Sequence, residues 1–96
     1  MIRSRVVASL RGLAASLGPA AHGTEWHLFG SVARDEPDAA DIDLMILCRS
    51  DAQADALRQA FNPDSQELPI HLSLMTFDEA AEVDAVSVQR STPIVP

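Results

Sequence analysis

Leu28-Phe29-Gly30-Ser31-Val32-Ala33-Arg34 and Asp41-Ile42-Asp43-Leu44-Met45-Ile46-Leu47 are the two stretches that decide the fold of this chain. In the first, a short apolar strand runs into a Gly-Ser turn. In the second, two aspartates separated by one residue begin another apolar strand. Alternate residues of a strand point to the same face, so the carboxylates of Asp41 and Asp43 are predicted to lie side by side, about 7 Å apart along the strand.

These paired carboxylates indicate a site for a divalent cation. Two adjacent carboxylates repel each other and are costly to desolvate unless a cation lies between them. Mg²⁺ prefers oxygen ligands and typically binds together with substrate phosphates. The Gly30-Ser31 turn offers open backbone N–H groups and one hydroxyl to such phosphates. The alternative is a solvated strand start for the aspartates and an ordinary turn or helix cap for Ser31.

The same residues resemble the minimal nucleotidyltransferases, the smallest members of the DNA polymerase β-like superfamily. Gly30-Ser31, Ala33-Arg34 and Asp41-x-Asp43 match the usual family pattern, which reads Gly-Ser-x-Ala-Arg-Gly and, after a polar loop, Ser-Asp-Ile-Asp-Leu. The resemblance covers about residues 3–80. It implies an α/β (α+β) fold, in which helices pack on one side of a small mixed β-sheet, as in the polymerase β-like nucleotidyltransferase core.

The resemblance also implies a reaction and a role for each residue. In nucleotidyl transfer, an acceptor hydroxyl attacks the α-phosphate of a nucleoside triphosphate, and pyrophosphate leaves. Asp41 and Asp43 would hold Mg²⁺, with Mn²⁺ as an alternative, and would act as catalytic residues. Gly30 and Ser31 would bind the β- and γ-phosphates of ATP. Arg34 would neutralise negative charge on the nucleotide, or else is an ordinary surface arginine.

The chain departs from the family pattern at two places. Catalytic members carry a third carboxylate on the strand beside the Asp-x-Asp strand, whereas the matching position here is His71, with Ser73 on the same face. Three roles are open to His71: a general base near neutral pH, a ligand of a softer ion such as Mn²⁺ or Zn²⁺, or a structural residue. Asp35 occupies a position where the family commonly has glycine, which predicts a different backbone in this loop.

Two functions from different classes compete. The first is an active enzyme that transfers AMP from ATP to a hydroxyl of a partner protein, because domains of this size lack the helical domain that binds the acceptor in larger relatives. The resemblance implies a helical HEPN-type toxin as partner, with this chain as the antitoxin of a toxin–antitoxin pair. The second is a catalytically degenerate binding module that neutralises a partner by occlusion, a reading motivated by His71. A small-molecule enzyme, such as an aminoglycoside nucleotidyltransferase, ranks last because its acceptor pocket needs a second domain.

The bulk properties narrow the class of protein. The 96 residues predict a single domain, residues 1–96, whose modest core leaves room for a partner or a homo-oligomer. The net charge of −7 disfavours nucleic acid and membrane surfaces as partners and suits a basic protein or simple solubility. One cysteine excludes a disulfide framework, and no apolar run has the length of a signal peptide or membrane span. We therefore expect a cytoplasmic protein.

The apolar spacing predicts the remaining elements. We expect helices over 3–17, 52–61 and 76–88, and strands over 24–29, 42–48 and 67–75. The strand over 42–48 should be central in the sheet, because its nearly unbroken apolar run indicates burial on both faces. Residues 93–95 offer a further edge strand, but two nearby prolines favour a loop. We predict that His27 lies at the surface or in an interface, and that Cys48 is a buried small hydrophobic residue.

Overall fold

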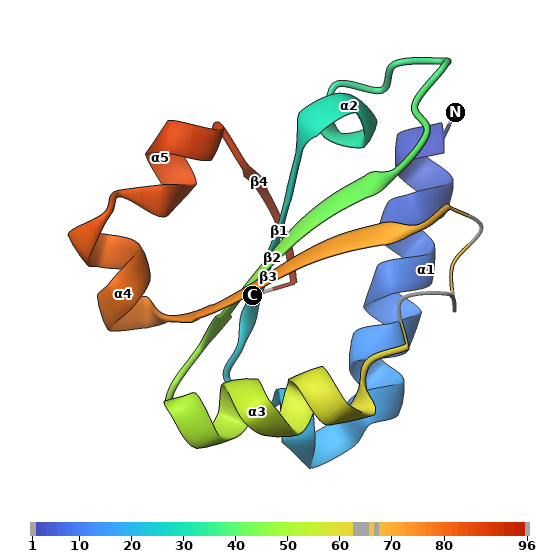
Figure 1. The fold of residues 1–96 in the computed structure, drawn as a ribbon. Coiled ribbons are helices and arrows are strands. Elements are labelled where there is room, and N and C mark those ends of the chain that lie inside the picture. The colour runs from blue at the N-terminus through green and yellow to red at the C-terminus, as the bar shows by residue number, and fades with distance from the viewer. Residues whose placement is uncertain (1, 63–65, 67, 96) are drawn as a thin grey trace.

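The computed structural model describes residues 2–62, 66 and 68–95, and in this part of the chain a four-stranded mixed sheet carries helices on both faces (Figure 1). The expected α+β fold is confirmed. None of the helices described is long and apolar enough to cross a bilayer. The strands are β1 (Glu25–Phe29), β2 (Ile42–Cys48), β3 (Ile70–Thr76) and β4 (Thr92–Val95). The helices are α1 (Ile2–Leu17), the 3-10 helix η1 (Gly18–Ala21), α2 (Gly30–Ala33), α3 (Asp51–Ala60), α4 (Phe77–Glu82) and α5 (Ala85–Gln89).

The strands lie in the order β3-β2-β1-β4, so β2 occupies the central position that its apolar sequence predicts. It runs parallel to β3 and antiparallel to β1, and β4 runs antiparallel to β1. Every residue of β2 except Asp43 is buried. A central strand covered on both faces needs apolar side chains on both, and β2 supplies them.

Two apolar clusters cover the two faces of the sheet. On one face, Leu44 and Ile46 of β2 pack with Leu10 of α1 and Leu57 of α3. On the other face, Met45 and its neighbours pack with the short helices α4 and α5. The sequence predicted helices on one side of the sheet, and α1 and α3 lie on that side. In contrast to this expectation, α4 and α5 lie on the opposite face, as Figure 1 shows. The candidate site residues lie on this second, less completely covered face.

Local capping determines where α3 and α4 begin. The Ser50 hydroxyl accepts a hydrogen bond from the backbone N–H of Gln53, and Thr76 forms a capping box with Glu79; both caps follow from the sequence pattern. The single helix expected over 76–88 is wrong, because the chain breaks between α4 and α5. Asp84 adopts a left-handed backbone with φ of 52°, which an aspartate tolerates better than most residues.

The C-terminal segment forms a strand, although its prolines favoured a loop. In β4, Pro93 pairs with His27 of β1, and Ile94 is buried in the main core. Because β4 lies at the edge of the sheet, it has no neighbouring strand on its other side. Proline, which lacks a backbone N–H, is tolerated in such an edge strand. Strand β3 begins at Ile70. The start expected at residue 67 lies outside the described residues.

A candidate cation site beside the Gly-Ser turn

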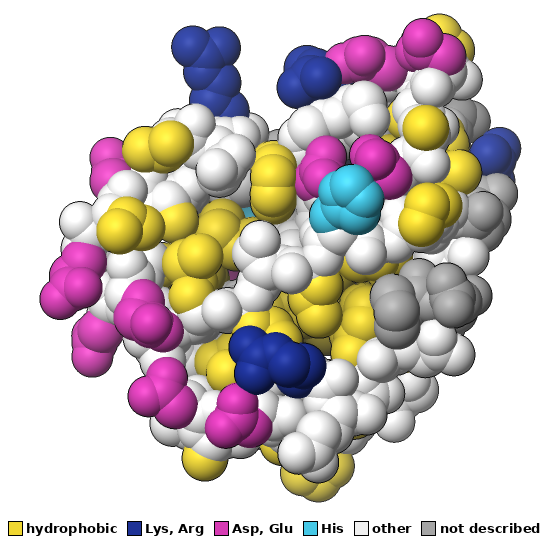
Figure 2. Space-filling model, viewed as in Figure 1, with side chains coloured by type: hydrophobic (Ala, Val, Ile, Leu, Met, Phe, Trp, Pro, Cys, Tyr) yellow, Lys and Arg dark blue, Asp and Glu magenta, His cyan; other side chains and the backbone are white. Residues whose placement is uncertain are grey.

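The structure brings Asp41, Asp43 and His71 together at one end of β2 and β3. The parallel register pairs Asp43 with His71, and Asp41 lies just before β2. His71 Nε2 is 3.7 Å from Asp41 Oδ2, and His71 Nδ1 is 3.5 Å from Asp43 Oδ1. One ligand atom from each of the three side chains can be chosen so that all lie within 4.8 Å of one another. Figure 2 shows a histidine and two acidic side chains grouped on this face of the molecule.

The residues of this group fit a divalent cation. Neighbouring and opposite ligands of an octahedral ion lie about 3 and 4.2 Å apart, so the three side chains need only small adjustments to share one ion. Two carboxylates suit Mg²⁺ and Mn²⁺ alike, whereas an imidazole suits Mn²⁺ or Zn²⁺ better. The His71 side chain is 67% exposed and Asp43 only 24%, so the site is open toward solvent on the histidine side. A substrate can therefore approach from that side.

Asp43 is the most perturbed carboxylate of the group. Its pKa is raised, chiefly because burial disfavours the charged form and secondarily because of the negative charge of Asp41. The charges of His71 and Arg34 act in the opposite direction without cancelling these effects. The folded protein therefore carries an electrostatic cost at this position, which a bound cation would remove.

Gly30, the first residue of the Gly-Ser turn, lies directly against the carboxylate of Asp43. Phe29 pairs with Asp43 across β1 and β2, so Gly30 follows directly beside the carboxylate. Its φ is +74°, and a Cβ at this position would overlap Asp43 Oδ2. Only glycine allows both the backbone conformation and the close approach. Ser31, half-buried in α2, is the next residue, so the predicted phosphate-binding turn and the predicted cation ligands lie in one place.

The loop after α2 accommodates its departure from the family pattern. Asp35 has φ of 56°, a left-handed conformation that glycine adopts without strain and aspartate tolerates. Its Oδ1 accepts a hydrogen bond of 3.1 Å from the backbone N–H of Arg3, near the start of α1. Asp35 thus compensates its backbone strain by binding a helix terminus. Arg34, which is 65% exposed, forms an ion pair with Glu36.

The sequence did not predict two features around this site. His27, expected at the surface or in an interface, is 4% exposed, because the segment from α5 to β4 covers it. Arg90 lines a cavity beside Gly30, although it lies 60 positions further along the chain. No motif surrounds either residue, so no local pattern could have found them. The prediction for Cys48 is confirmed, since the side chain is fully buried and burial raises the pKa of its thiol.

Comparison with known families places the whole site within one recognised domain. The model of a family described as nucleotidyltransferase domain matches residues 8–94 of this chain. That range includes the Gly-Ser turn, both aspartates and His71. Searches of curated proteins and of solved structures found no significant match.

Replacing Gly30 with alanine should disrupt the site. In Gly30→Ala, the new Cβ must displace the Asp43 carboxylate, so Mn²⁺ binding measured by calorimetry should be lost. The unfavourable φ should also lower the free energy of unfolding, measured in urea, by about 1–3 kcal/mol. Gly12→Ala is the matched control, because Gly12 lies in α1 with open space around it. The free energy of unfolding of that variant should rise by about 0.5–1 kcal/mol, and the variant should bind Mn²⁺ normally. Normal Mn²⁺ binding in Gly30→Ala would refute this account of the turn.

The raised pKa of Asp43 predicts how the stability of the protein depends on pH. The folded state holds a proton on Asp43 at pH values where the unfolded chain, with a pKa near 3.8, has lost it. Stability contributed by Asp43 is therefore lost as pH rises from the unfolded pKa through the folded pKa. In the presence of a chelator, Asp43→Asn should be more stable than the native protein at pH 7.

The difference in free energy of unfolding between Asp43→Asn and the native protein should shrink as the pH falls. It should disappear below about pH 4, near the unfolded pKa of an aspartate. Urea denaturation between pH 3.5 and 7 measures it. Asp38→Asn, a substitution at an exposed position of the loop before β2, should show no such difference. A variant Asp43→Asn that is less stable than the native protein at pH 7 would contradict the electrostatic reading.

Proposed function

The chain belongs to the nucleotidyltransferase domain family, and from this premise we propose that it transfers AMP from ATP to a hydroxyl group of a partner protein. One observation carries the proposal: Asp41, Asp43 and His71 converge beside Gly30, the first residue of the Gly-Ser turn. This arrangement offers cation ligands and phosphate contacts next to each other. Nucleotidyl transfer needs both, because the reacting group is a phosphate that carries negative charge.

In the proposed reaction, the acceptor oxygen attacks the α-phosphorus of ATP. A new phosphorus–oxygen bond forms, the bond to the bridging oxygen of pyrophosphate breaks, and the hydroxyl proton passes to water at the open face of the site. A divalent cation would supply neutralisation of the phosphate oxygens and activation of the attacking hydroxyl. Asp41 and Asp43 would hold the cation. Gly30 and Ser31 would contact the β- and γ-phosphates through their backbone N–H groups and the hydroxyl.

We assign His71 to the ligands of the cation, in place of the third carboxylate. Its two ring nitrogens face the two aspartates, at 3.7 and 3.5 Å, so a neutral imidazole can share an ion with both. The replacement removes one negative charge from the site. Mn²⁺ should therefore serve at least as well as Mg²⁺, because it accepts a nitrogen ligand more readily. A general-base role for His71 is the alternative, which the exposed ring also permits.

The surface formed by α4 and α5 supports a protein as acceptor. Val83 and Val88 are 62% and 68% exposed, beside an apolar cavity of about 270 Å³ lined in part by Phe29 and Met45. Phe29 and Met45 are sequence neighbours of the site residues. We propose that a partner with apolar and basic side chains binds here, in the role of a helical HEPN-type toxin. Exposed carboxylates on α4 and directly before α5 favour a basic partner: Asp78, Glu79, Glu82 and Asp84.

The second candidate function is a binding module without catalysis. The observation that favours it is again His71, because a family member that lacks the third carboxylate has lost one oxygen ligand of its cation. In that case the protein would neutralise its partner by covering it. The acidic surface of α4 and α5 serves this function equally well, so only a measurement of transfer separates the two.

The proposal predicts a metal-dependent transfer reaction that requires Asp43. With ATP labelled at the α-phosphate and a co-expressed HEPN-type toxin as acceptor, labelled AMP should appear on the toxin only when Mg²⁺ or Mn²⁺ is present. Asp43→Asn should reduce the transfer by at least about 100-fold, because the cation loses a direct ligand. Asp38→Asn removes the same charge from an exposed position and should transfer normally. Transfer that persists in Asp43→Asn would refute the mechanism.

Variants at His71 separate the enzyme from the binding module. If the protein is an enzyme, His71→Ala should lose most of the transfer, and His71→Asp should restore it with Mg²⁺ as the preferred ion. If it is a binding module, neither variant should transfer AMP, and both should bind the partner as tightly as the native protein does.

A further inference from the structure

Two arginine side chains, those of Arg34 and Arg90, line a cavity beside the Gly-Ser turn. A cavity of about 350 Å³ lies between α2 and the junction of α5 with β4. Gly30 and Arg34 line one wall, and Arg90 lines the other. Figure 2 shows basic side chains above α2 and above the end of α5, with an indentation between them. Two of the seven basic residues of a chain with net charge −7 therefore border one cavity.

The charge of Arg90 is available for a ligand. Arg34 is already paired with Glu36, whereas Arg90 makes no ion pair with any residue that the structure describes. Arg90 has a left-handed backbone with φ of 51°, and its N–H donates to the carbonyl oxygen of Ser87 at 3.1 Å. A non-glycine residue persists in this conformation only where its surroundings hold it, and such positions cluster at functional sites.

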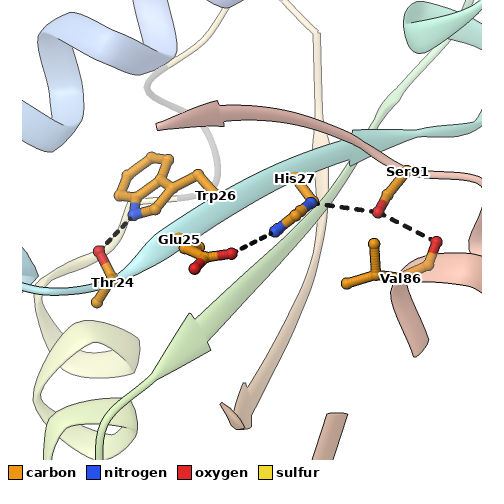
Figure 3. Close-up of polar contacts among 6 residues, drawn as sticks. All are labelled: Thr24, Glu25, Trp26, His27, Val86 and Ser91. Carbon is orange, nitrogen blue, oxygen red and sulfur yellow. Dashed lines mark hydrogen bonds and ion pairs between the residues drawn. The ribbon is translucent and has the colours of Figure 1, made fainter. Parts of the chain in front are cut away.

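A partly buried polar network supplies that support (Figure 3). The imidazole of His27, in β1, lies with Nε2 3.2 Å from Glu25 Oε1 and with Nδ1 3.3 Å from the hydroxyl of Ser91. The N–H of Ser91 donates to the carbonyl oxygen of Val86 in α5, at 3.2 Å. Because Ser91 directly follows Arg90, the network ties the backbone of Arg90 to the centre of the sheet.

We propose that Arg90 binds the terminal phosphates of the donor nucleotide, across the cavity from Arg34, and that Ser91 and His27 are positioning residues for it. The inference rests on the proposed function, and it names the ligand chemistry of this cavity as a polyphosphate. A guanidinium presents a planar fork of donors that matches phosphate oxygens. Gly30 belongs both to this cavity and to the cation site, so a triphosphate held at the Gly-Ser turn lies within reach of Arg90.

The experiment measures binding of ATP with Mn²⁺, and of tripolyphosphate alone, by calorimetry. Arg90→Ala should weaken both by about tenfold or more, since it removes charge-assisted hydrogen bonds to phosphate. Arg90→Lys should recover part of the affinity. The matched control is Arg58→Ala, which removes the same charge from an exposed position on α3, where Arg58 pairs with Asp55. This variant should bind both ligands as the native protein does.

The positioning role has its own readout. Ser91→Ala should weaken tripolyphosphate binding, but the double variant Ser91→Ala/Arg90→Ala should bind no more weakly than Arg90→Ala alone. Such non-additivity is expected only if Ser91 acts through Arg90. Additive losses in the double variant would overturn the positioning role. A urea midpoint close to the native value in each variant establishes that the fold is retained.

The outcomes separate this inference from the proposed function. If the native protein and Arg90→Ala bind ATP equally, the inference is overturned while the transfer reaction stands. If the native protein binds tripolyphosphate through Arg90 but does not bind ATP with Mn²⁺, the anion site is supported and the proposed function is overturned. If it binds neither ligand, both are overturned.

Discussion

The parallel pairing of β2 with β3 is the constraint on which the candidate site depends. It sets Asp43 opposite His71, and a slip of one residue would turn His71 to the other face of the sheet. The apolar core holds this register, because Leu72 and Leu74 of β3 pair with Leu44 and Ile46 of β2, and all four side chains pack in the same cluster. The side chains of Asp43 and His71, at one end of the strands, are therefore positioned by packing further along the same strands.

This positioning has a cost in stability at the candidate site. Burial and the neighbouring carboxylate raise the pKa of Asp43, and the close approach of Gly30 leaves its carboxylate little freedom to move away. Three non-glycine residues have a left-handed backbone: Asp35 after α2, Arg90 at the end of α5, and Asp84 in the break between α4 and α5. Of these three, Arg90 borders the cavity beside Gly30, and strained positions of this kind often occur at functional sites.

The sequence predicted the parts of the structure that depend on local pattern. The central position of β2 and the Asp-x-Asp and Gly-Ser groups follow from residues close together in the chain. The remaining features depend on which distant segments pack together. His27 is buried because Ser91, 64 residues later, returns beside it, and Arg90 reaches the cavity for the same reason. The break at Asp84 and the pairing of β4 despite Pro93 likewise reflect tertiary packing, which overrides local propensity.

The most direct test of the account is pulsed electron paramagnetic resonance of Mn²⁺ bound with ATP to protein labelled with ¹⁵N at histidine. The chain has three histidines, all in the part that the structure describes, and of these only His71 belongs to the candidate cation site. If His71 is a ligand of the cation, a ¹⁵N coupling to Mn²⁺ should appear in the native protein and disappear in His71→Asp while Mn²⁺ remains bound. Mn²⁺ that binds the native protein with ATP but shows no ¹⁵N coupling would contradict the claim that Asp41, Asp43 and His71 together hold the cation.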